Sequence, residues 1–157
     1  MESCCFTGHR LLPTGEAGAR LTRLTEDSVR DAYRMGCRRF FAGGALGFDM
    51  LAAAVVCHLR DTELTDISLH LILPCRDQDS RWSARDRERY QKMLLLADSH
   101  VYLYDAYATG VMAARNRALV NAADLCIAYM TTAGSGTGLT VSMAERRGIP
   151  VWNLAKK

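Results

Sequence analysis

The feature that most constrains the fold of this chain is a regular alternation of short apolar runs with longer segments of helical period. The strand-like runs are Cys4 to Thr7, Arg39 to Ala42, Ser68 to Leu73, His100 to Tyr104, Leu125 to Met130 and Val151 to Leu154. The helical segments are Leu21 to Met35, Asp49 to Arg60, Ser83 to Ala97, Ala113 to Ala122 and Gly138 to Gly148. This order predicts an α/β fold, a Rossmann-like three-layer α/β/α sandwich with a mainly parallel sheet of about six strands.

The length and composition favour one folded unit. The chain has 157 residues, so we expect residues 1–157 to form a single domain. Hydrophobic residues make up 49% and charged residues 24%, which excludes a disordered or fibrous chain. No apolar run approaches the roughly 18 residues of a membrane span, so we expect no membrane partner.

The cysteines and histidines indicate a reduced protein without a metal. The six cysteines show no CxxC spacing, and the N-terminus lacks the apolar segment of a signal peptide. We therefore expect reduced, mostly buried thiols and a cytoplasmic location. The four histidines lie far apart and pair with no cysteine at ligand spacing, so we expect no metal site.

The segments that follow the strands carry the candidate chemistry, because an open parallel sheet binds ligands at the carboxyl ends of its strands. Two of these segments, 43–49 and 131–138, are rich in glycine and lead directly into a helix. Glycines at such a turn let the backbone approach an anion, and the first N–H groups of the helix point at it. We therefore predict a phosphate or ribose-phosphate site, with a plain tight turn as the alternative at each loop.

The candidate ligand-binding residues share a position just after a strand or in the first turns of the next helix. They are Thr7, Gly8, His9, Arg10, Gly43, Gly44, Ala45, Gly47, Asp49, Arg115, Asn116, Gly134, Ser135, Gly136 and Thr137. Arg115 is the candidate for a bidentate contact with a phosphate or carboxylate, with a surface salt bridge as the alternative. His9 is a donor or an acid at the centre of the pocket.

A second, smaller set follows the third strand. Pro74, Gln78 and Trp82 are candidates for a lid or a contact with a base. Trp82 has the ring to stack on a base, but a role in the core explains it equally well.

The common nucleotide and hydrolase fingerprints are absent. The segment Gly134-x-Gly136-x-Gly138 lacks the GxGxxG spacing and follows the fifth strand, which argues against ordinary NAD binding. No GxxxxGK[ST] or G-x-S-x-G motif occurs, so an ATPase P-loop and an acyl hydrolase are excluded. No cofactor is therefore assigned beyond a nucleotide-like ligand.

In combination, four motifs resemble the YpsA-like branch of the SLOG superfamily, which is named for the DNA-uptake protein DprA (Smf) and the plant enzyme Lonely Guy. The motifs are Thr7-Gly-His-Arg10, Gly43-Gly-Ala-Leu-Gly-Phe-Asp49, Leu73-Pro-Cys75 with Gln78 and Trp82, and Gly134-Ser-Gly-Thr137. The likeness covers nearly the whole chain. It implies a nucleotide-related ligand held by the two glycine loops.

The resemblance also bears on catalysis. In the cytokinin-activating relatives an Arg and a Glu cleave the base from a nucleoside monophosphate. Here Arg115 matches the Arg, whereas Thr140 stands in place of the Glu. A threonine does not supply a carboxylate that stabilises an oxocarbenium-like centre or activates water. The resemblance therefore implies that phosphate binding is retained, and it argues against the base-cleaving activity of these relatives.

Three hypotheses follow. The first is a sensor or adaptor that binds a nucleotide or a nucleotide derivative. The second is an N-glycosidase or phosphoribohydrolase in which Asp49, Asp77 or Asp79 replaces the missing Glu. The third is single-stranded DNA binding in the manner of DprA, but the net charge is only +3 and aromatic residues make up 8%, so we do not expect nucleic acid as a partner. Homodimerisation stays open.

Overall fold

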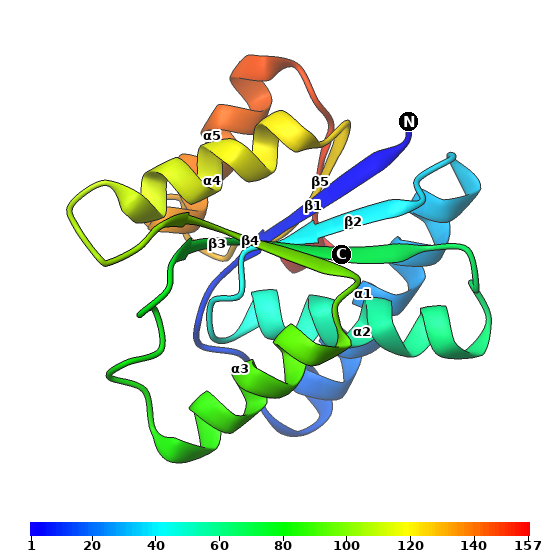
Figure 1. Cartoon of the computed structure of the whole chain (residues 1–157). Helices are drawn as coiled ribbons and strands as arrows, with labels where there is room; N and C mark the ends of the chain where they lie inside the picture. Colours follow the sequence, from blue (N-terminus) through cyan, green and yellow to red (C-terminus); the bar gives the residue numbers. More distant parts are fainter.

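A computed structural model describes residues 1–157 and contains one six-stranded, all-parallel sheet (Figure 1). Its strands are β1 (Ser3–Gly8), β2 (Arg39–Ala42), β3 (Ser68–Cys75), β4 (Ser99–Tyr104), β5 (Leu125–Tyr129) and β6 (Val151–Asn153). Their order across the sheet is β4-β3-β2-β1-β5-β6. The predicted Rossmann-like α/β class is confirmed.

Five helices cover the two faces of the sheet. They are α1 (Gly15–Arg34), α2 (Phe48–Thr62), α3 (Ala84–Leu96), α4 (Val111–Ala122) and α5 (Gly136–Arg147). In Figure 1, α1, α2 and α3 lie on one face, and α4 and α5 lie on the other. None of the helices combines the length and apolar character that crossing a lipid bilayer requires.

The strand order places a switch point at β1. From β1 the chain builds outward through β2, β3 and β4, and it then returns to add β5 and β6 on the other side of β1. The connections before and after the return therefore run over opposite faces, and they leave a crevice at the carboxyl ends of β1 and β5. Ligands of doubly wound sheets bind at such crevices.

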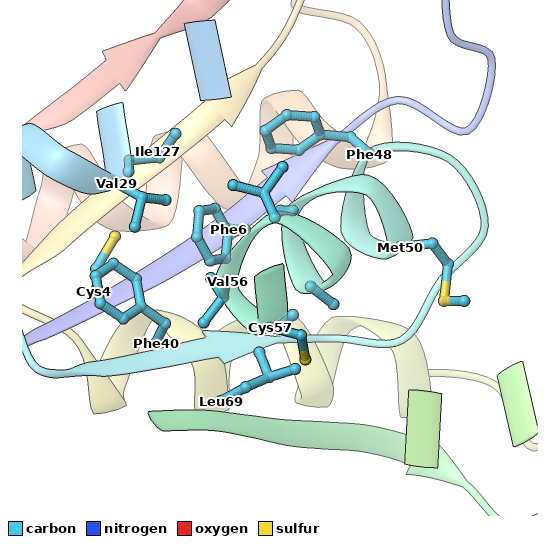
Figure 2. Packing of buried hydrophobic residues seen from close by; sticks show 14 of the residues in the cluster. Cys4, Phe6, Val29, Phe40, Phe48, Met50, Val56, Cys57, Leu69 and Ile127 are labelled. Carbon is cyan, nitrogen blue, oxygen red and sulfur yellow. The ribbon is translucent and has the colours of Figure 1, made fainter. Parts of the chain in front are cut away.

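Two hydrophobic clusters hold the layers together because successive residues of β1 point to opposite faces. Cys4 and Phe6 belong to the larger cluster, on the face covered by α1, α2 and α3. There Phe6 stacks on Phe40 with 6.0 Å between ring centroids, and Phe48 meets Phe6 edge to face (Figure 2). Cys5 belongs to the smaller cluster beneath α4 and α5.

The element boundaries differ from the sequence prediction chiefly at three helix starts, of which α4 begins two residues early, at Val111. Helix α1 begins at Gly15, six residues before the predicted Leu21. The sequence prediction missed the first turns because they are polar and exposed and carry no apolar stripe. Helix α5 begins at Gly136, two residues before the predicted Gly138, because the Ser135 hydroxyl accepts the Gly138 N–H at 3.2 Å and caps the helix there.

Candidate functional site

A cleft of about 320 Å³ lies at the switch point, between the carboxyl end of β1 and the first turns of α4 and α5. It is lined by Phe6, Thr7, Gly8, His9, Arg10, Ala45, Asp49, Met112, Arg115, Asn116, Leu119, Ser135, Gly136 and Thr137. Four segments that are remote in sequence therefore converge on one cavity, and eleven of these fourteen residues belong to the predicted ligand-binding set.

Arg115 is a buried cation on the wall of the cleft. Its side chain comes from the second turn of α4, and the residue is only 6% exposed. Nη1 donates to the carbonyl oxygen of Gly43 at 2.6 Å and Nε donates to Oδ1 of Asn116 at 2.7 Å. Nη2 has only the Met112 sulfur at 3.9 Å, so one edge of the guanidinium has no oxygen acceptor.

Asp49 is the acidic residue of the cleft. It lies in the first turn of α2, it is buried, and its Oδ2 accepts the Ala45 N–H at 3.3 Å. Burial raises the pKa of the Asp49 carboxyl, and the Arg115 guanidinium opposes the rise. Burial also lowers the pKa of Arg115, and Asp49 opposes that shift. The two groups compensate each other, although they form no salt bridge within 4.0 Å.

The first turn of α5 presents unused donors to the cleft. No hydrogen bond within the protein uses the N–H groups of Gly136 and Thr137 or the Thr137 hydroxyl. Thr137 is 7% exposed, and its residual surface lies on the cleft. Open space surrounds the position of a Cβ at Gly136 and at Gly134, so no neighbouring group requires glycine there. These donors, together with the helix dipole, suit an anion.

His9 links the cleft to the loop before α5. Its Nε2 accepts the Thr131 N–H at 2.8 Å, and its ring meets Tyr129 edge to face. An acceptor at Nε2 places the proton of the neutral imidazole on Nδ1. His9 therefore positions the loop between β5 and α5 while it lines the cleft.

The glycines of the loop after β2 serve close packing. Gly44 and Gly47 have positive φ angles of 71° and 85°. A Cβ at Gly44 would lie 2.4 Å from Leu73, and one at Gly47 would lie 2.3 Å from the Arg10 carbonyl oxygen. Gly43, Gly44 and Gly47 do not line the cleft, whereas Ala45 does.

A second cavity of about 540 Å³, called the groove below, adjoins the cleft. It is lined by Arg10, Asp77, Gln78, Ser80, Arg81, Trp82, Tyr107 and Met112. Arg10 and Met112 line both cavities, so the two are contiguous. Of the residues predicted as a lid or base contact, Gln78 and Trp82 lie in the groove, whereas Pro74 is buried within β3 and lines neither cavity.

Sequence reasoning missed several lining residues. Met112, Phe6 and Leu119 are apolar and carry no chemical signal of their own. Tyr107 follows β4, so the rule that ligands lie after strands applies to it as it does to the other loops. No three side chains among His, Cys, Asp and Glu form a cluster suited to a metal ion.

The structure also locates the acids considered for catalysis. Thr140 is fully buried, and its hydroxyl donates to the Gly136 carbonyl oxygen at 3.2 Å, away from the cleft. Asp49 lines the cleft and Asp77 lines the groove. Asp79 is buried, and its carboxylate accepts from Gln91 at 3.3 Å outside both cavities.

The parallel sheet defines a Rossmann-like α/β protein, and its donor-rich cleft at the switch point is the candidate ligand site. The model of the YspA SLOG family (YpsA) matches residues 18–146, and the chain belongs to this family. The resemblance inferred from the motifs is therefore confirmed.

Two bacterial proteins are similar to this chain in sequence. A UPF0398 protein of Shouchella clausii is 32% identical over 78 residues, which are 50% of this chain and 42% of that protein. The SPbeta prophage-derived protein YoqJ of Bacillus subtilis is 26% identical over 130 residues, which are 74% of this chain and 75% of YoqJ. The chain thus spans less than half of the first relative and three quarters of the second.

Two solved structures share the fold. DNA processing protein A of Helicobacter pylori, described for its single-stranded DNA binding mode, superposes with a TM-score of 0.67 at 19% identity over 96% of this chain and 63% of that one. DNA processing protein A (DprA) of Streptococcus pneumoniae superposes with a TM-score of 0.68 at 15% identity over 96% and 49%.

These neighbours correct one expectation. We did not expect nucleic acid as a partner, and that expectation is wrong, because a protein described as binding single-stranded DNA shares the fold. The net charge of +3 is a poor guide because it averages over the whole surface. Arg10, Arg81 and Arg115 gather at the cleft and groove, and none of them forms a salt bridge.

Proposed function

We propose that this protein binds a nucleotide or a nucleotide derivative, with a phosphate group in the cleft, and acts as a sensor or adaptor. The observation that carries the proposal is that one cleft is lined both by Arg115, whose guanidinium has an unpartnered edge, and by Gly136 and Thr137, whose N–H groups are unused. A phosphate supplies several acceptor oxygens, and it satisfies donors from both helices at once.

The electrostatics of the cleft support an anionic ligand. Asp49 compensates part of the charge of Arg115, while Arg10, which also lines the cleft, forms no salt bridge. The cleft therefore holds two guanidinium groups and one carboxylate. A buried carboxylate beside the anion sets a limit on the charge that the site tolerates, which favours a phosphate monoester or diester over a more highly charged group.

Single-stranded DNA binding is a second candidate function. One support is the fold that this chain shares with DNA processing protein A of Helicobacter pylori. The other is the groove, which adjoins the cleft and is lined by Arg10 and Arg81. In that case the phosphate in the cleft belongs to a strand. Affinity then falls steeply as salt rises, because several phosphates release counterions.

The experiment is isothermal titration calorimetry with AMP, ADP-ribose and a 12-residue oligodeoxyadenylate at two salt concentrations. Thr137→Val removes a hydroxyl that has no partner within the protein, so we expect binding to weaken at least about fivefold while the melting temperature stays within about 2 °C. Thr140→Val is the matched control, because its hydroxyl bonds within α5 and does not reach the cleft.

Each result has one meaning. Binding that is weakened by Thr137→Val but not by Thr140→Val supports a phosphate in the cleft. The absence of heat with all three ligands at two temperatures about 15 °C apart refutes the proposal, because a binding enthalpy that is zero at one temperature is not zero at the other. If the protein releases free adenine from AMP and Asp49→Asn abolishes this activity, the protein is an N-glycosidase and not a sensor. Asp49 is the variant to test because its carboxylate lines the cleft.

A further inference from the structure

The groove beside the cleft has room for a second part of a ligand. It has about 540 Å³ against about 320 Å³ for the cleft, and each falls within or near the size of ordinary small-molecule sites. Because Arg10 and Met112 line both cavities, a ligand that leaves the cleft at Arg10 enters the groove directly.

Gln78 gives the groove a polar group without a partner. The residue is only 9% exposed, and its Nε2 donates to the Tyr90 hydroxyl at 3.3 Å. Its Oε1 is buried and has no hydrogen-bond partner within the protein. An unpaired buried acceptor is costly, and such atoms concentrate at functional sites. Because Gln78 lines the groove, the imino or amino N–H of a nucleobase satisfies this oxygen once the amide side chain turns toward the ligand.

Two aromatic residues flank the same groove. Trp82 is half-buried and held edge to face against Tyr90, with 5.2 Å between ring centroids. Tyr107 is 64% exposed, yet its backbone is fixed because its N–H donates to Oδ1 of Asp77 at 2.9 Å. An exposed ring on an anchored backbone is suited to stacking on a base, and stacking accepts any base.

The charge of the groove resembles that of the cleft, so the exposed aromatic ring of Tyr107 and the ring of Trp82 are what suit the groove to a base. Arg81 and Arg10 have no acidic partner, whereas Asp77 contributes a carboxylate. The two guanidinium groups leave the groove with a positive balance that tolerates a phosphate at its edge. Arg10, between the two cavities, is placed for the phosphate that joins the two parts of the ligand.

We propose that the cleft holds one complete nucleotide, that the groove is a subsite for a second nucleobase, and that the ligand of this protein therefore contains two nucleoside units joined through phosphate. This inference rests on the proposed function, because the cleft has to hold the first phosphate. Two nucleosides joined through phosphate occur both in a free dinucleotide and in two consecutive nucleotides of a single-stranded nucleic acid.

The test uses the fluorescence of Trp82. The chain has two tryptophans, so Trp152→Phe leaves Trp82 as the single reporter at the groove. This protein is titrated with AMP, with the 5′-phosphorylated dinucleotide pApA and with a 12-residue oligodeoxyadenylate. We expect pApA to bind at least about fivefold more tightly than AMP, which is the lower end of what one stacked base contributes. We also expect pApA, but not AMP, to change the Trp82 emission.

Variants locate the second unit. Tyr107→Ala is expected to reduce the affinity for pApA to that for AMP and to leave AMP binding unchanged. Tyr104→Ala is the matched control, because this tyrosine of β4 is 49% exposed and lines neither cavity. Gln78→Met is expected to weaken pApA binding more than AMP binding, since it removes the acceptor for a base N–H.

The outcomes separate the two proposals. Equal affinities for AMP and pApA, or an unchanged pApA affinity in Tyr107→Ala, overturn the nucleobase subsite and leave the cleft intact. Loss of binding to every ligand overturns both. The proposal is supported when the gain from pApA depends on Tyr107. In that case, tighter binding of the 12-residue strand than of pApA identifies a polynucleotide, and equal binding identifies a dinucleotide.

Discussion

Nη1 of Arg115 donates a 2.6 Å hydrogen bond to the carbonyl oxygen of Gly43, and this contact ties helix α4 to the loop after β2 across the carboxyl edge of the sheet. The absence of a side chain at Gly43 makes the contact possible. A Cβ there would lie 2.7 Å from Nη1 of Arg115 and 2.9 Å from Oδ2 of Asp49. The glycine therefore sets the distance between the two buried charges.

Gly43→Ala is the first prediction. The added methyl group displaces Arg115 and Asp49, and overpacking of this kind costs about 1–3 kcal/mol in the free energy of unfolding. We expect that loss in urea denaturation, together with weaker nucleotide binding. Gly134→Ala is the control, because nothing lies within 4 Å of the added Cβ and its φ is not positive. Equal stability of the two variants would contradict the packing argument.

Ile127→Lys tests the core assignment of β5. Ile127 is fully buried, and it pairs with Phe6 of β1 and Trp152 of β6. An unpaired charge at this position costs several kcal/mol, so we expect the variant to lose its cooperative thermal transition in circular dichroism. Val101→Lys on β4 is 51% exposed and should unfold like the wild type. A stable, ligand-binding Ile127→Lys protein would refute the assignment.

The sequence predicted the sheet well because each strand carries its own signal. The boundaries of β2 agree at both ends, and β1, β3 and β5 differ by one or two residues. Rows of buried apolar residues bounded by glycine, proline or polar turns are local features. Helix α1 started earlier than expected because its first turns depend on backbone hydrogen bonds and not on an apolar stripe.

The candidate site was predictable in place and less so in detail. From the sequence alone, the rule that ligands lie after strands brings Thr7, Arg115 and Thr137 together, and all three line the cleft. The sequence did not predict which glycines are needed for close packing and which are not. A Cβ at Gly136 would meet open space, whereas one at Gly47 would clash with the backbone of Arg10. This difference depends on neighbours that are remote in sequence.

His9→Ala is expected to loosen the loop before α5. His9 Nε2 accepts the Thr131 N–H at 2.8 Å, and alanine removes that acceptor. Hydrogen exchange of the segment 130–135 should therefore accelerate, and nucleotide affinity should fall because the first turn of α5 is less well positioned. His9→Gln retains an acceptor and should restore part of the protection. Unchanged exchange in His9→Ala would show that the loop is held by other contacts.

His70 links stability to pH on the β4 side of the sheet. Its two ring nitrogens lie 2.7 Å from the Ser68 hydroxyl and 2.6 Å from the Ser99 hydroxyl. Burial lowers the pKa of His70 from its ordinary 6.5; the Asp98 carboxylate opposes this shift, and Arg39 adds to it. The unfolded chain therefore takes up the proton at higher pH than the folded chain.

The sign of the effect follows from this order of protonation. The stability that neutral His70 contributes is complete above pH 6.5, and it is lost as the pH falls below 6.5 through the lower pKa of the folded state. We expect the free energy of unfolding, measured in urea, to fall more steeply between pH 7 and pH 5 in the wild type than in His70→Gln. At pH 8 the two proteins should differ by an amount that no longer varies with pH. Parallel curves from pH 8 to pH 5 would show that His70 titrates alike in the folded and unfolded chains.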